Sequence, residues 1–272
     1  MEKSKASTKG NTLFVASLEK GLRVLKAFGQ KHDGYNMTNL SLAEIASACN
    51  LDNSAAQRFT NTLVELGYLE KNPRTKRYRP SINLMDLSYS YLLCDPLVET
   101  AMPILIEVSR KYNTSINLGV LQGCDIIYSA RIPHEKVPYA ATIPGRRVPA
   151  FCTSGGIAIL SHMSDDYIES VLQVSDQKKY TDWTITETEE IRSRIKLARS
   201  NGYDLSIQQL EPGEISTAAP ILDSQGIPIA AVQIPVYMPT WTVEAASKEI
   251  APIVVDVANT ITRALRSHPK LV

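Results

Sequence analysis

The chain has 272 residues, with 44% hydrophobic and 21% charged residues, values ordinary for a globular protein large enough to hold two domains. The net charge of +1 hides an uneven distribution. Residues 1–80 hold 13 Lys and Arg against 7 Asp and Glu, a net of +6, and the remainder has a net of −5. This asymmetry favours a nucleic-acid-binding head on a weakly acidic body.

The composition also excludes several classes of protein. The four cysteines and four histidines are scattered, without the spacing of a metal site or a disulfide framework, and no cofactor motif is present. The first ten residues are rich in Lys and Ser and lack the apolar core of a signal peptide. No apolar run approaches the roughly 18 residues that span a bilayer. We therefore expect a cytoplasmic protein with no membrane contact.

A helix-turn-helix pattern follows the first forty residues. Ser41 and Glu44 have the spacing of a capping box, which predicts the start of a short first helix. Asn50 falls where the chain must reverse, and Asn tolerates the left-handed backbone that such a turn needs. Asp52 or Ser54 can then cap a second helix with apolar residues at helical spacing.

A basic hairpin follows this pattern. Gly67 ends the second helix, and a turn-rich hairpin over residues 68–79 carries three cations at and just past its tip. This combination is typical of a winged helix, which we place at residues 14–80 behind a disordered arm over residues 1–13. The alternative is a small helical core with an incidental basic hairpin.

The exposed face of the second helix is expected to read DNA. Gln57 can read adenine and Arg58 guanine, whereas Asn53 and Ser54 sit near the helix start, where phosphates bind. For Arg58 an ion pair with Glu44 or Glu65 is the alternative, and for the wing cations simple solvation. The expected DNA contacts are Ser41, Asn53, Ser54, Gln57, Arg58, Asn61, Arg74, Lys76 and Arg77.

A linker helix is predicted over residues 81–98. Pro96 and Pro103 interrupt the helical spacing, so two or three helical pieces are expected instead of one rod. The linker has an apolar stripe, which either packs within its own subunit or forms a dimer contact.

The remaining residues, 99–267, have an α+β pattern. Two apolar segments, 115–121 and 124–132, predict a β-hairpin, and further strands and helices follow. Thr186 and Glu189 have the spacing of a second capping box. We expect an antiparallel sheet flanked by helices, a GAF-like arrangement.

This order of elements resembles the IclR family of bacterial transcriptional regulators, from about Phe14 to Leu265. The segments that carry the resemblance are SLEKGLRVLKAF, SLAEIASACNLDNSAAQRFTNTLVELGYLEKN, GRRVPAFCTSGGIAIL and GYDLSIQQLEPGEISTAAPILDSQGIPIAAVQI. The chain departs from the family where Asn50 replaces a common Gly and Ala55 a common Thr. Phe151 and Ile157 likewise replace a frequent His and Lys, which makes the expected pocket less polar.

The resemblance implies a ligand-responsive regulator, either a homodimer or a dimer of dimers, that binds operator DNA and controls a catabolic operon. It can repress, or activate through a contact with RNA polymerase. The implied effector is a small organic acid, and Phe151 favours an aromatic one. We expect the backbone around Thr153, Ser154 and Gly155 to hold its carboxylate. The expected effector-site residues are Phe151, Cys152, Thr153, Ser154, Gly155, Ser206, Ser216 and Gln233.

Two other functions are alternatives to this one. A hydrolase could use Cys152 or Ser154 as its nucleophile, but no histidine is placed by a recognisable motif, and TSGG is not a G-x-S-x-G elbow. A purely architectural DNA-binding dimer would leave the large sheet domain without a role. The sequence therefore predicts a regulator and no enzymatic activity.

Overall fold

The computed structural model describes residues 13–29, 31–32, 35–36, 38–134 and 143–267. The chain forms two compact units, and the division falls between Tyr91 and Leu92. The arm expected over residues 1–13 lies outside the described residues, except for Leu13. No helix among the described residues is long and apolar enough to cross a membrane.

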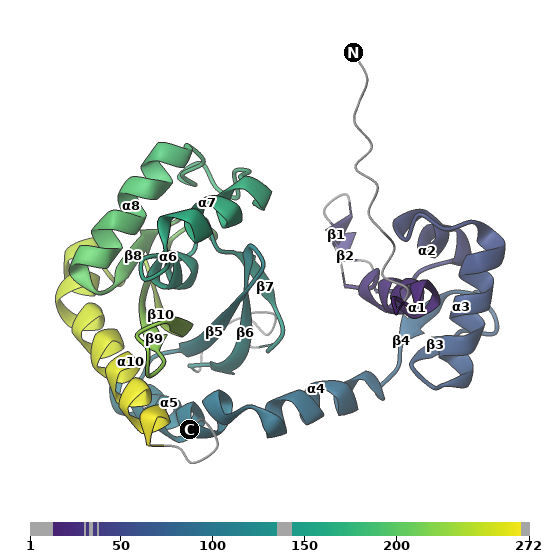
Figure 1. The fold of residues 1–272 in the computed structure, drawn as a ribbon, viewed down its shortest axis with the longest axis horizontal. Helices are drawn as coiled ribbons and strands as arrows, with labels where there is room; N and C mark the ends of the chain where they lie inside the picture. Colours follow the sequence, from purple (N-terminus) through teal and green to yellow (C-terminus); the bar gives the residue numbers. More distant parts are fainter. Residues whose placement is uncertain (1–12, 30, 33–34, 37, 135–142, 268–272) are drawn as a thin grey trace. The chain divides into compact units, whose positions relative to one another are not determined.

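The first unit is a helical domain with a hairpin (Figure 1). A bridge between Leu40 and Tyr78 ties the hairpin to the segment before the second helix. Both of these residues are buried, together with Val24, Ile45 and Leu63, in one apolar core. The elements of this unit are α1 Ala16–Lys26, β1 Lys31–His32, β2 Tyr35–Asn36, α2 Leu42–Ala48, α3 Asn53–Glu65, β3 Leu69–Lys71 and β4 Tyr78–Pro80.

Local side-chain contacts fix the helix-turn-helix. The predicted capping box is confirmed: the Glu44 backbone N–H donates to Ser41 Oγ, and the Ser41 backbone N–H donates to Glu44 Oε2. Asn50 has a φ of 50°, in the left-handed region. Asp52 caps α3 by accepting a hydrogen bond from the Ala55 backbone N–H at 2.7 Å. Gly67, with a φ of 77°, then turns the chain into β3.

Two helices follow, α4 (Leu84–Cys94) and α5 (Pro96–Tyr112). Asp95 lies between them and caps α5, and Pro96 takes the first helical position, where its missing N–H costs nothing. The predicted interruption at Pro96 is confirmed. The interruption expected at Pro103 is not seen: Pro103 lies inside α5, and the helix continues past it. None of the residues of α4 is buried.

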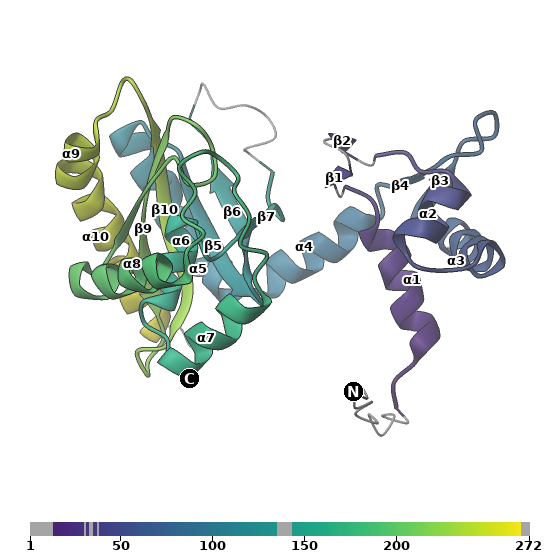
Figure 2. The same cartoon turned by 90° about the horizontal axis from the view of Figure 1, so that it is seen from above.

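The second unit is built on a six-stranded antiparallel sheet, in which the spatial order is β7-β6-β5-β10-β9-β8 (Figure 2). The predicted hairpin is confirmed as β5 paired with β6. The strands are β5 Ile116–Gln122, β6 Asp125–Ile132, β7 Arg147–Pro149, β8 Asp204–Ile207, β9 Glu214–Leu222 and β10 Pro228–Tyr237.

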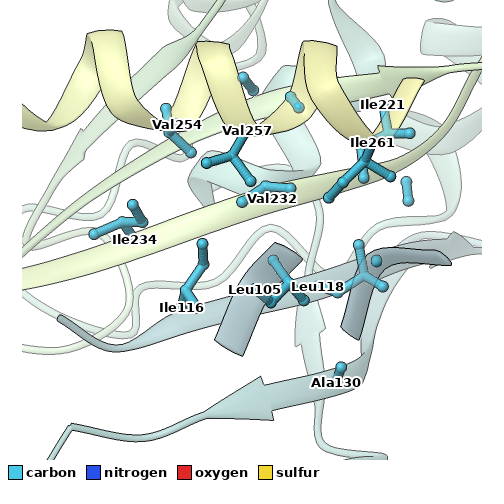
Figure 3. Close-up of a cluster of buried hydrophobic side chains, with 14 of the residues drawn as sticks. Leu105, Ile116, Leu118, Ala130, Ile221, Val232, Ile234, Val254, Val257 and Ile261 are labelled. Atoms are coloured by element: carbon cyan, nitrogen blue, oxygen red, sulfur yellow. The ribbon is translucent and has the colours of Figure 1, made fainter. Parts of the chain in front are cut away.

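Helices cover both faces of this sheet. The helices are α6 Ser154–Leu160, α7 Asp165–Val174, α8 Thr188–Asn201, α9 Val243–Ala245, the π-helical turn η2 Ala246–Ile250, and α10 Ala251–Arg266. One face packs against α5 and α10, with Leu105, Leu118 and Val257 in the main apolar core (Figure 3). Each such buried side chain stabilises the fold by about 1.5–3 kcal/mol.

The opposite face packs against α6, where Ala158 and Ile159 meet Ala218 and Ala231 of the sheet. Side chains alternate along a strand, so Val232 faces α10 and Gln233 faces the α6 side. One local prediction is wrong on this side: α8 begins after Glu187 without a side-chain cap, so Thr186 and Glu189 form no capping box.

Candidate DNA-binding surface and effector cavity

The exposed face of α3 presents the polar residues predicted to read DNA. Ser54, Gln57, Arg58 and Asn61 recur at intervals of three and four residues and are all exposed, so they share one face of the helix. Asn53, at the first turn, is also exposed. The buried side of α3 carries Ala56, Thr60 and Leu63.

Arg58 makes none of the ion pairs recorded among the described residues. Its expected alternative partner, Glu44, is instead bound by Arg77, whose Nη2 lies 2.6 Å from Glu44 Oε2. The backbone N–H of Ser41, and then Arg77, lower the pKa of Glu44 to about 2. Arg58 thus keeps its guanidinium exposed on the face that would meet DNA.

Two predicted contacts have structural roles inside the domain. Arg77 donates from Nε and Nη2 to the Asn39 carbonyl, at 3.1 and 2.9 Å, in addition to its bond with Glu44. Ser41 uses its hydroxyl as the cap of α2. Arg77 therefore joins the wing to α2, and much of its charge is neutralised there.

The wing tip is held by Asn72. Its side-chain oxygen accepts hydrogen bonds from the backbone N–H groups of Arg74 and Thr75, at 2.9 and 3.0 Å. Lys76 follows in a left-handed conformation, with φ of 59°. Arg74 and Lys76 are exposed at the end of the hairpin, where cations can approach a phosphate backbone.

The second unit contains a small polar cavity between α6 and the sheet. Five of the predicted effector-site residues line it: Thr153, Ser154, Ser206, Ser216 and Gln233. Gln209, Leu210 and Glu214 complete the wall. The cavity volume is about 10 Å³, room for roughly one water molecule. A larger ligand must therefore displace part of this wall.

The other three predicted effector residues do not line the cavity. Phe151 and Cys152 are fully buried in the apolar cluster formed with α7 and α8. Gly155 lies behind Gln233, since a Cβ on it would come within 3.6 Å of Gln233 Oε1. The stretch from 151 to 155 passes from strand to helix, so its side chains point in different directions.

The side chains of the cavity wall hydrogen-bond one another. Tyr128 Oη donates to Gln233 Oε1 at 2.7 Å, and Gln233 Nε2 donates to Ser216 Oγ at 2.6 Å. Ser216 Oγ then lies 2.8 Å from Ser154 Oγ. Burial raises the pKa of Tyr128 to about 12, so the phenol keeps its proton as the donor of this chain.

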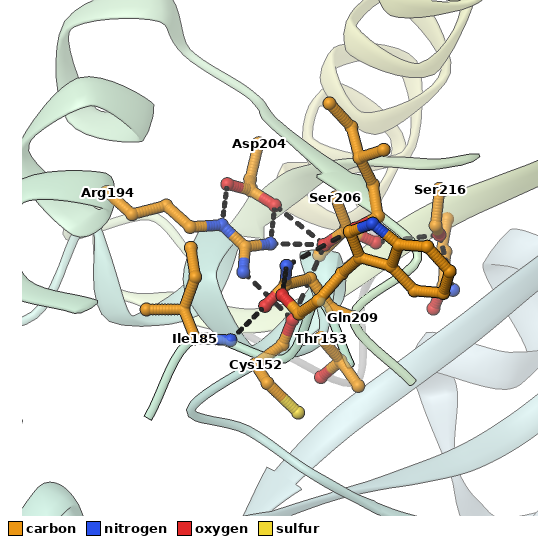
Figure 4. Close-up of polar contacts among 12 residues, drawn as sticks. Cys152, Thr153, Ile185, Arg194, Asp204, Ser206, Gln209 and Ser216 are labelled. Atoms are coloured by element: carbon orange, nitrogen blue, oxygen red, sulfur yellow. Dashed lines mark hydrogen bonds and ion pairs between the residues drawn. The ribbon is translucent and has the colours of Figure 1, made fainter. Parts of the chain in front are cut away.

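A buried ion pair closes one side of the cavity (Figure 4). Arg194 of α8 donates from Nε and Nη2 to the two carboxylate oxygens of Asp204, at 2.9 and 2.6 Å. It also bonds the Cys152 carbonyl and Ser206 Oγ. Apart from the basic character of α8, no sequence pattern indicates this pair, because its partners become neighbours only when α8 packs on β8.

Glu214 is a second residue of the wall that sequence reasoning missed. Burial, together with the charge of Glu211, raises its pKa to about 7. Tyr237 Oη donates to Glu214 Oε2 at 3.3 Å, a weak contact. A carboxyl group poised near neutral pH therefore faces the cavity.

The features required of a hydrolase do not come together. Burial raises the pKa of the Cys152 thiol to about 12, far from the thiolate form that attacks a substrate. Ser154 Oγ bonds Ser216, a hydroxyl and not a base. No cluster of side chains suited to a metal is found in the part of the chain that the structure describes.

An exposed recognition helix, a basic wing and a separate sheet domain with a polar cavity define a class: DNA-binding regulators of the winged-helix type. Residues 17–73 match the model of the IclR helix-turn-helix domain, and residues 90–263 match that of the bacterial transcriptional regulator IclR C-terminal domain. The chain belongs to the IclR family of bacterial transcriptional regulators. The predicted family and fold class are confirmed.

Two curated relatives are named as regulatory proteins. The chain is 30% identical over 245 residues to the Pca regulon regulatory protein of Pseudomonas putida, covering 90% of this chain and 82% of that one. It is 27% identical over 224 residues to the p-hydroxybenzoate hydroxylase transcriptional activator of Acinetobacter baylyi, covering 80% of each.

Solved structures share the fold. The IclR protein of Thermotoga maritima matches with a TM-score of 0.68 at 23% identity, covering 92% of this chain and 99% of that one. An IclR homologue from Microbacterium hydrocarbonoxydans, solved in complex with 4-hydroxybenzoate, matches with a TM-score of 0.74 at 22% identity, covering 93% and 100%.

Proposed function

We propose that this regulator binds a small organic acid in the cavity between α6 and the sheet, and that binding changes its affinity for operator DNA. The observation that carries the proposal is the wall itself: buried hydroxyls and an amide, bonded mainly to one another, around a cavity that is nearly closed. Such a wall can exchange its internal hydrogen bonds for those of a polar ligand.

An aromatic acid is the preferred class of effector. Support comes from the P. putida and A. baylyi relatives, whose names refer to Pca and p-hydroxybenzoate genes, and from the M. hydrocarbonoxydans homologue solved with 4-hydroxybenzoate. The serine hydroxyls and Gln233 can hydrogen-bond either the hydroxyl or the carboxylate of a hydroxy acid. The target would then be an operon for the breakdown of such acids.

Calorimetry tests the cavity directly. Benzoate, 4-hydroxybenzoate and a short 2-oxo acid would be titrated into the wild type, Gln233→Leu and Gln225→Leu. Gln225 lies exposed in the β9–β10 turn and is the matched control. We expect one acid to bind the wild type and the control alike and Gln233→Leu at least tenfold more weakly. Equal binding by all three proteins would show that the cavity is not the effector site.

The same titrations, followed by a gel-shift with operator DNA, separate a sensor from an architectural protein. A ligand can change DNA affinity only through its different affinities for two arrangements of the regulator. An operator complex that ignores every acid bound by the cavity would favour the architectural alternative. Release of DNA fits a repressor, and tighter binding or a contact with RNA polymerase fits an activator.

We further propose that the protein acts as a homodimer, or as a dimer of dimers, in the cytoplasm where its DNA lies. The support is α4, on which four large apolar side chains are exposed in the single chain: Met85, Leu87, Tyr89 and Leu93. A helix with apolar residues all round is normally covered. Light scattering on the wild type and Leu87→Glu tests this assignment, since a monomeric wild type would exclude it.

No part of this proposal requires catalysis. The thiol of Cys152 is buried and protonated, and Ser154 lacks a base. Incubation of the protein with ester and amide derivatives of the bound acid would detect any hydrolysis. Turnover that disappears in Ser154→Ala would restore the hydrolase alternative.

A further inference from the structure

A partly buried arginine of the sheet lacks partners for two of its nitrogens. Arg131 lies on β6, and its Nε and Nη1 atoms are buried and make no hydrogen bond. It also forms none of the ion pairs found among the described residues. Burial lowers its pKa, but a guanidinium keeps its charge in proteins. Buried N–H donors without an acceptor are costly, so a purely structural role does not account for these two nitrogens.

The strand register places Arg131 beside the cavity. Arg131 is paired with Asn117 of β5, and Asn117 is paired with Gln233 of β10. Residues paired directly across neighbouring strands point to the same face of a sheet. Arg131 therefore shares the face of Gln233, the face on which the cavity opens.

The ring of Tyr128 links the two groups. The Arg131 guanidinium carbon lies 4.2 Å from the centre of this ring, and the hydroxyl at the end of the same ring donates to Gln233 at 2.7 Å. The guanidinium thus stacks on a side chain that is itself part of the cavity wall. Stacking holds the planar group while leaving its edges free to donate.

The neighbouring carboxyl groups leave this charge available. Glu211 is occupied by Arg146, at 2.7 Å. Glu214 interacts with Arg131 only at longer range, and its pKa of about 7 leaves it partly protonated at neutral pH. Across the cavity, each nitrogen of Arg194 already donates to Asp204, Ser206 or the Cys152 carbonyl. Arg131 is therefore the cation beside the cavity with donors to spare.

The geometry points to Arg131 as the residue that binds the carboxylate of the acid effector. This inference rests on the proposed function and makes it more specific, because it moves the carboxylate from the start of α6 to β6. The hydroxyls of Ser154 and Ser216 then serve the uncharged part of the ligand. An arginine recognises a carboxylate through charge and several parallel N–H donors, whereas a neutral amide offers it neither.

The test compares an acid with its neutral amide in two proteins and a control. Calorimetry would measure benzoate against benzamide, and 4-hydroxybenzoate against 4-hydroxybenzamide, in the wild type, Arg131→Met and Arg147→Met. Arg147 is an exposed arginine of the adjacent strand, paired with Asp125, and is the matched control. Inorganic phosphate is included to detect a site for any anion.

We expect the wild type and Arg147→Met to prefer the acid over the amide by tenfold or more. Arg131→Met should lose this preference while still binding the amide. The melting temperature of the unliganded Arg131→Met protein should not fall, whereas loss of a structural arginine would lower it. An undiminished preference in Arg131→Met would overturn the inference and leave the proposed function intact.

Two further results would also decide against it. Binding of phosphate as tight as that of the best acid would indicate a general anion site and not recognition of an effector. If the wild type bound no acid at all, the proposed function would fail, and this inference with it.

Discussion

Arg77 and Glu44 join the wing to the first helix of the helix-turn-helix through a contact of 2.6 Å. The same Glu44 carboxylate accepts the backbone N–H of Ser41 and so completes the cap of α2. One side chain therefore fixes both the start of α2 and the base of the wing. This pair therefore fixes the position of the wing relative to the helix-turn-helix.

This pair predicts a loss of stability in acid. Hydrogen bonds to Ser41 and Arg77 lower the pKa of Glu44 to about 2, below its ordinary value of 4.5. The unfolded chain thus binds the proton first, so the stabilisation is present above pH 4.5 and is lost as the pH falls toward 2. Because the carboxylate is substantially exposed, we expect a contribution of only about 0.5–1 kcal/mol.

Urea unfolding of the wild type and Glu44→Gln between pH 3 and pH 7 would measure this contribution. The two proteins should differ most at pH 7, and the difference should shrink steadily as the pH falls from 4.5 toward 3. Glu65→Gln, an exposed substitution on α3, is the control and should follow the wild type. A constant difference between wild type and Glu44→Gln at all pH values would show that the charge is not responsible.

The wing tip should contribute affinity without sequence preference. Arg74 and Lys76 are exposed at the tip, and we expect Arg74→Ala with Lys76→Ala to weaken binding to all DNA sequences. Loss of two phosphate contacts should also reduce the salt slope of log K by about 2. A double variant that removes the same charge elsewhere, Lys196→Ala with Lys248→Ala, is the control. Fluorescence anisotropy at several salt concentrations measures the slope, and an unchanged slope would contradict the wing assignment.

Arg58 should contribute to recognition of the operator sequence. Its guanidinium is exposed on the face of α3 that we expect to meet DNA, and a bidentate contact with guanine would be worth about 1–3 kcal/mol. Arg58→Ala should therefore weaken operator binding more than binding to random DNA. Arg58→Lys is the informative control, because lysine retains the charge but cannot form bidentate hydrogen bonds with a base. Equal losses on operator and random DNA would reduce Arg58 to a phosphate contact.

Glu214 predicts a pH dependence of the opposite sign in the second unit. Burial and the Glu211 charge raise its pKa to about 7, above the ordinary 4.5, with Arg131, Arg146 and Tyr237 also facing it. The folded state then binds more protons than the unfolded state between these values. Stability from this group is accordingly full below pH 4.5 and falls as the pH rises through 7.

We expect the free energy of unfolding of the wild type to fall by on the order of 1–3 kcal/mol between pH 5 and pH 8. Glu214→Gln should not show this fall. Melting curves of wild type and variant across this range would reveal it, with Glu190→Gln on the exposed side of α8 as the control. The two curves should begin to separate at about pH 5 and reach their full separation above pH 7, the variant being the more stable protein there. Parallel curves over the whole range would show that Glu214 titrates normally.

Local sequence signals were sufficient for much of the fold but not for the cavity. The capping box at Ser41, the left-handed turn at Asn50 and the hairpin of β5 and β6 each depend on residues close together in the chain. By contrast, the contact of Arg77 with Glu44 joins residues 33 positions apart, and Tyr128 meets Gln233 across 105 positions. Such contacts depend on tertiary packing, which no short pattern encodes.

The position of Phe151 and Cys152 outside the cavity wall has the same origin. Their neighbours Thr153 and Ser154 line the cavity, and a continuous stretch of sequence gives no indication of where the chain turns. Here the chain passes from β7 into α6, so the first two side chains enter the apolar core with α7 and α8. The small residues of this stretch indicate the region of the cavity, but only the three-dimensional fold distinguishes the residues of the cavity wall from those of the core.

Gly156 should be the least replaceable residue of α6. A Cβ added there would lie 2.1 Å from the Ala150 carbonyl oxygen, a clash with backbone that cannot move aside easily. Gly155 differs, because its added Cβ would make only an ordinary contact of 3.6 Å with Gln233 Oε1. We expect Gly156→Ala to destabilise the protein by about 1–3 kcal/mol, the usual cost of overpacking. It should also weaken acid binding, because α6 carries Ser154 into the cavity.

Two glycine variants serve as controls in the same unfolding and calorimetry measurements. Gly155→Ala should retain stability, because alanine suits a helix better than glycine does. Gly21→Ala in α1 meets nothing within 4 Å and should be neutral or stabilising by up to about 1 kcal/mol. If Gly156→Ala were as stable as these two and bound acid normally, α6 would not be held against Ala150. Close packing at Gly156 would then not be what positions the cavity wall.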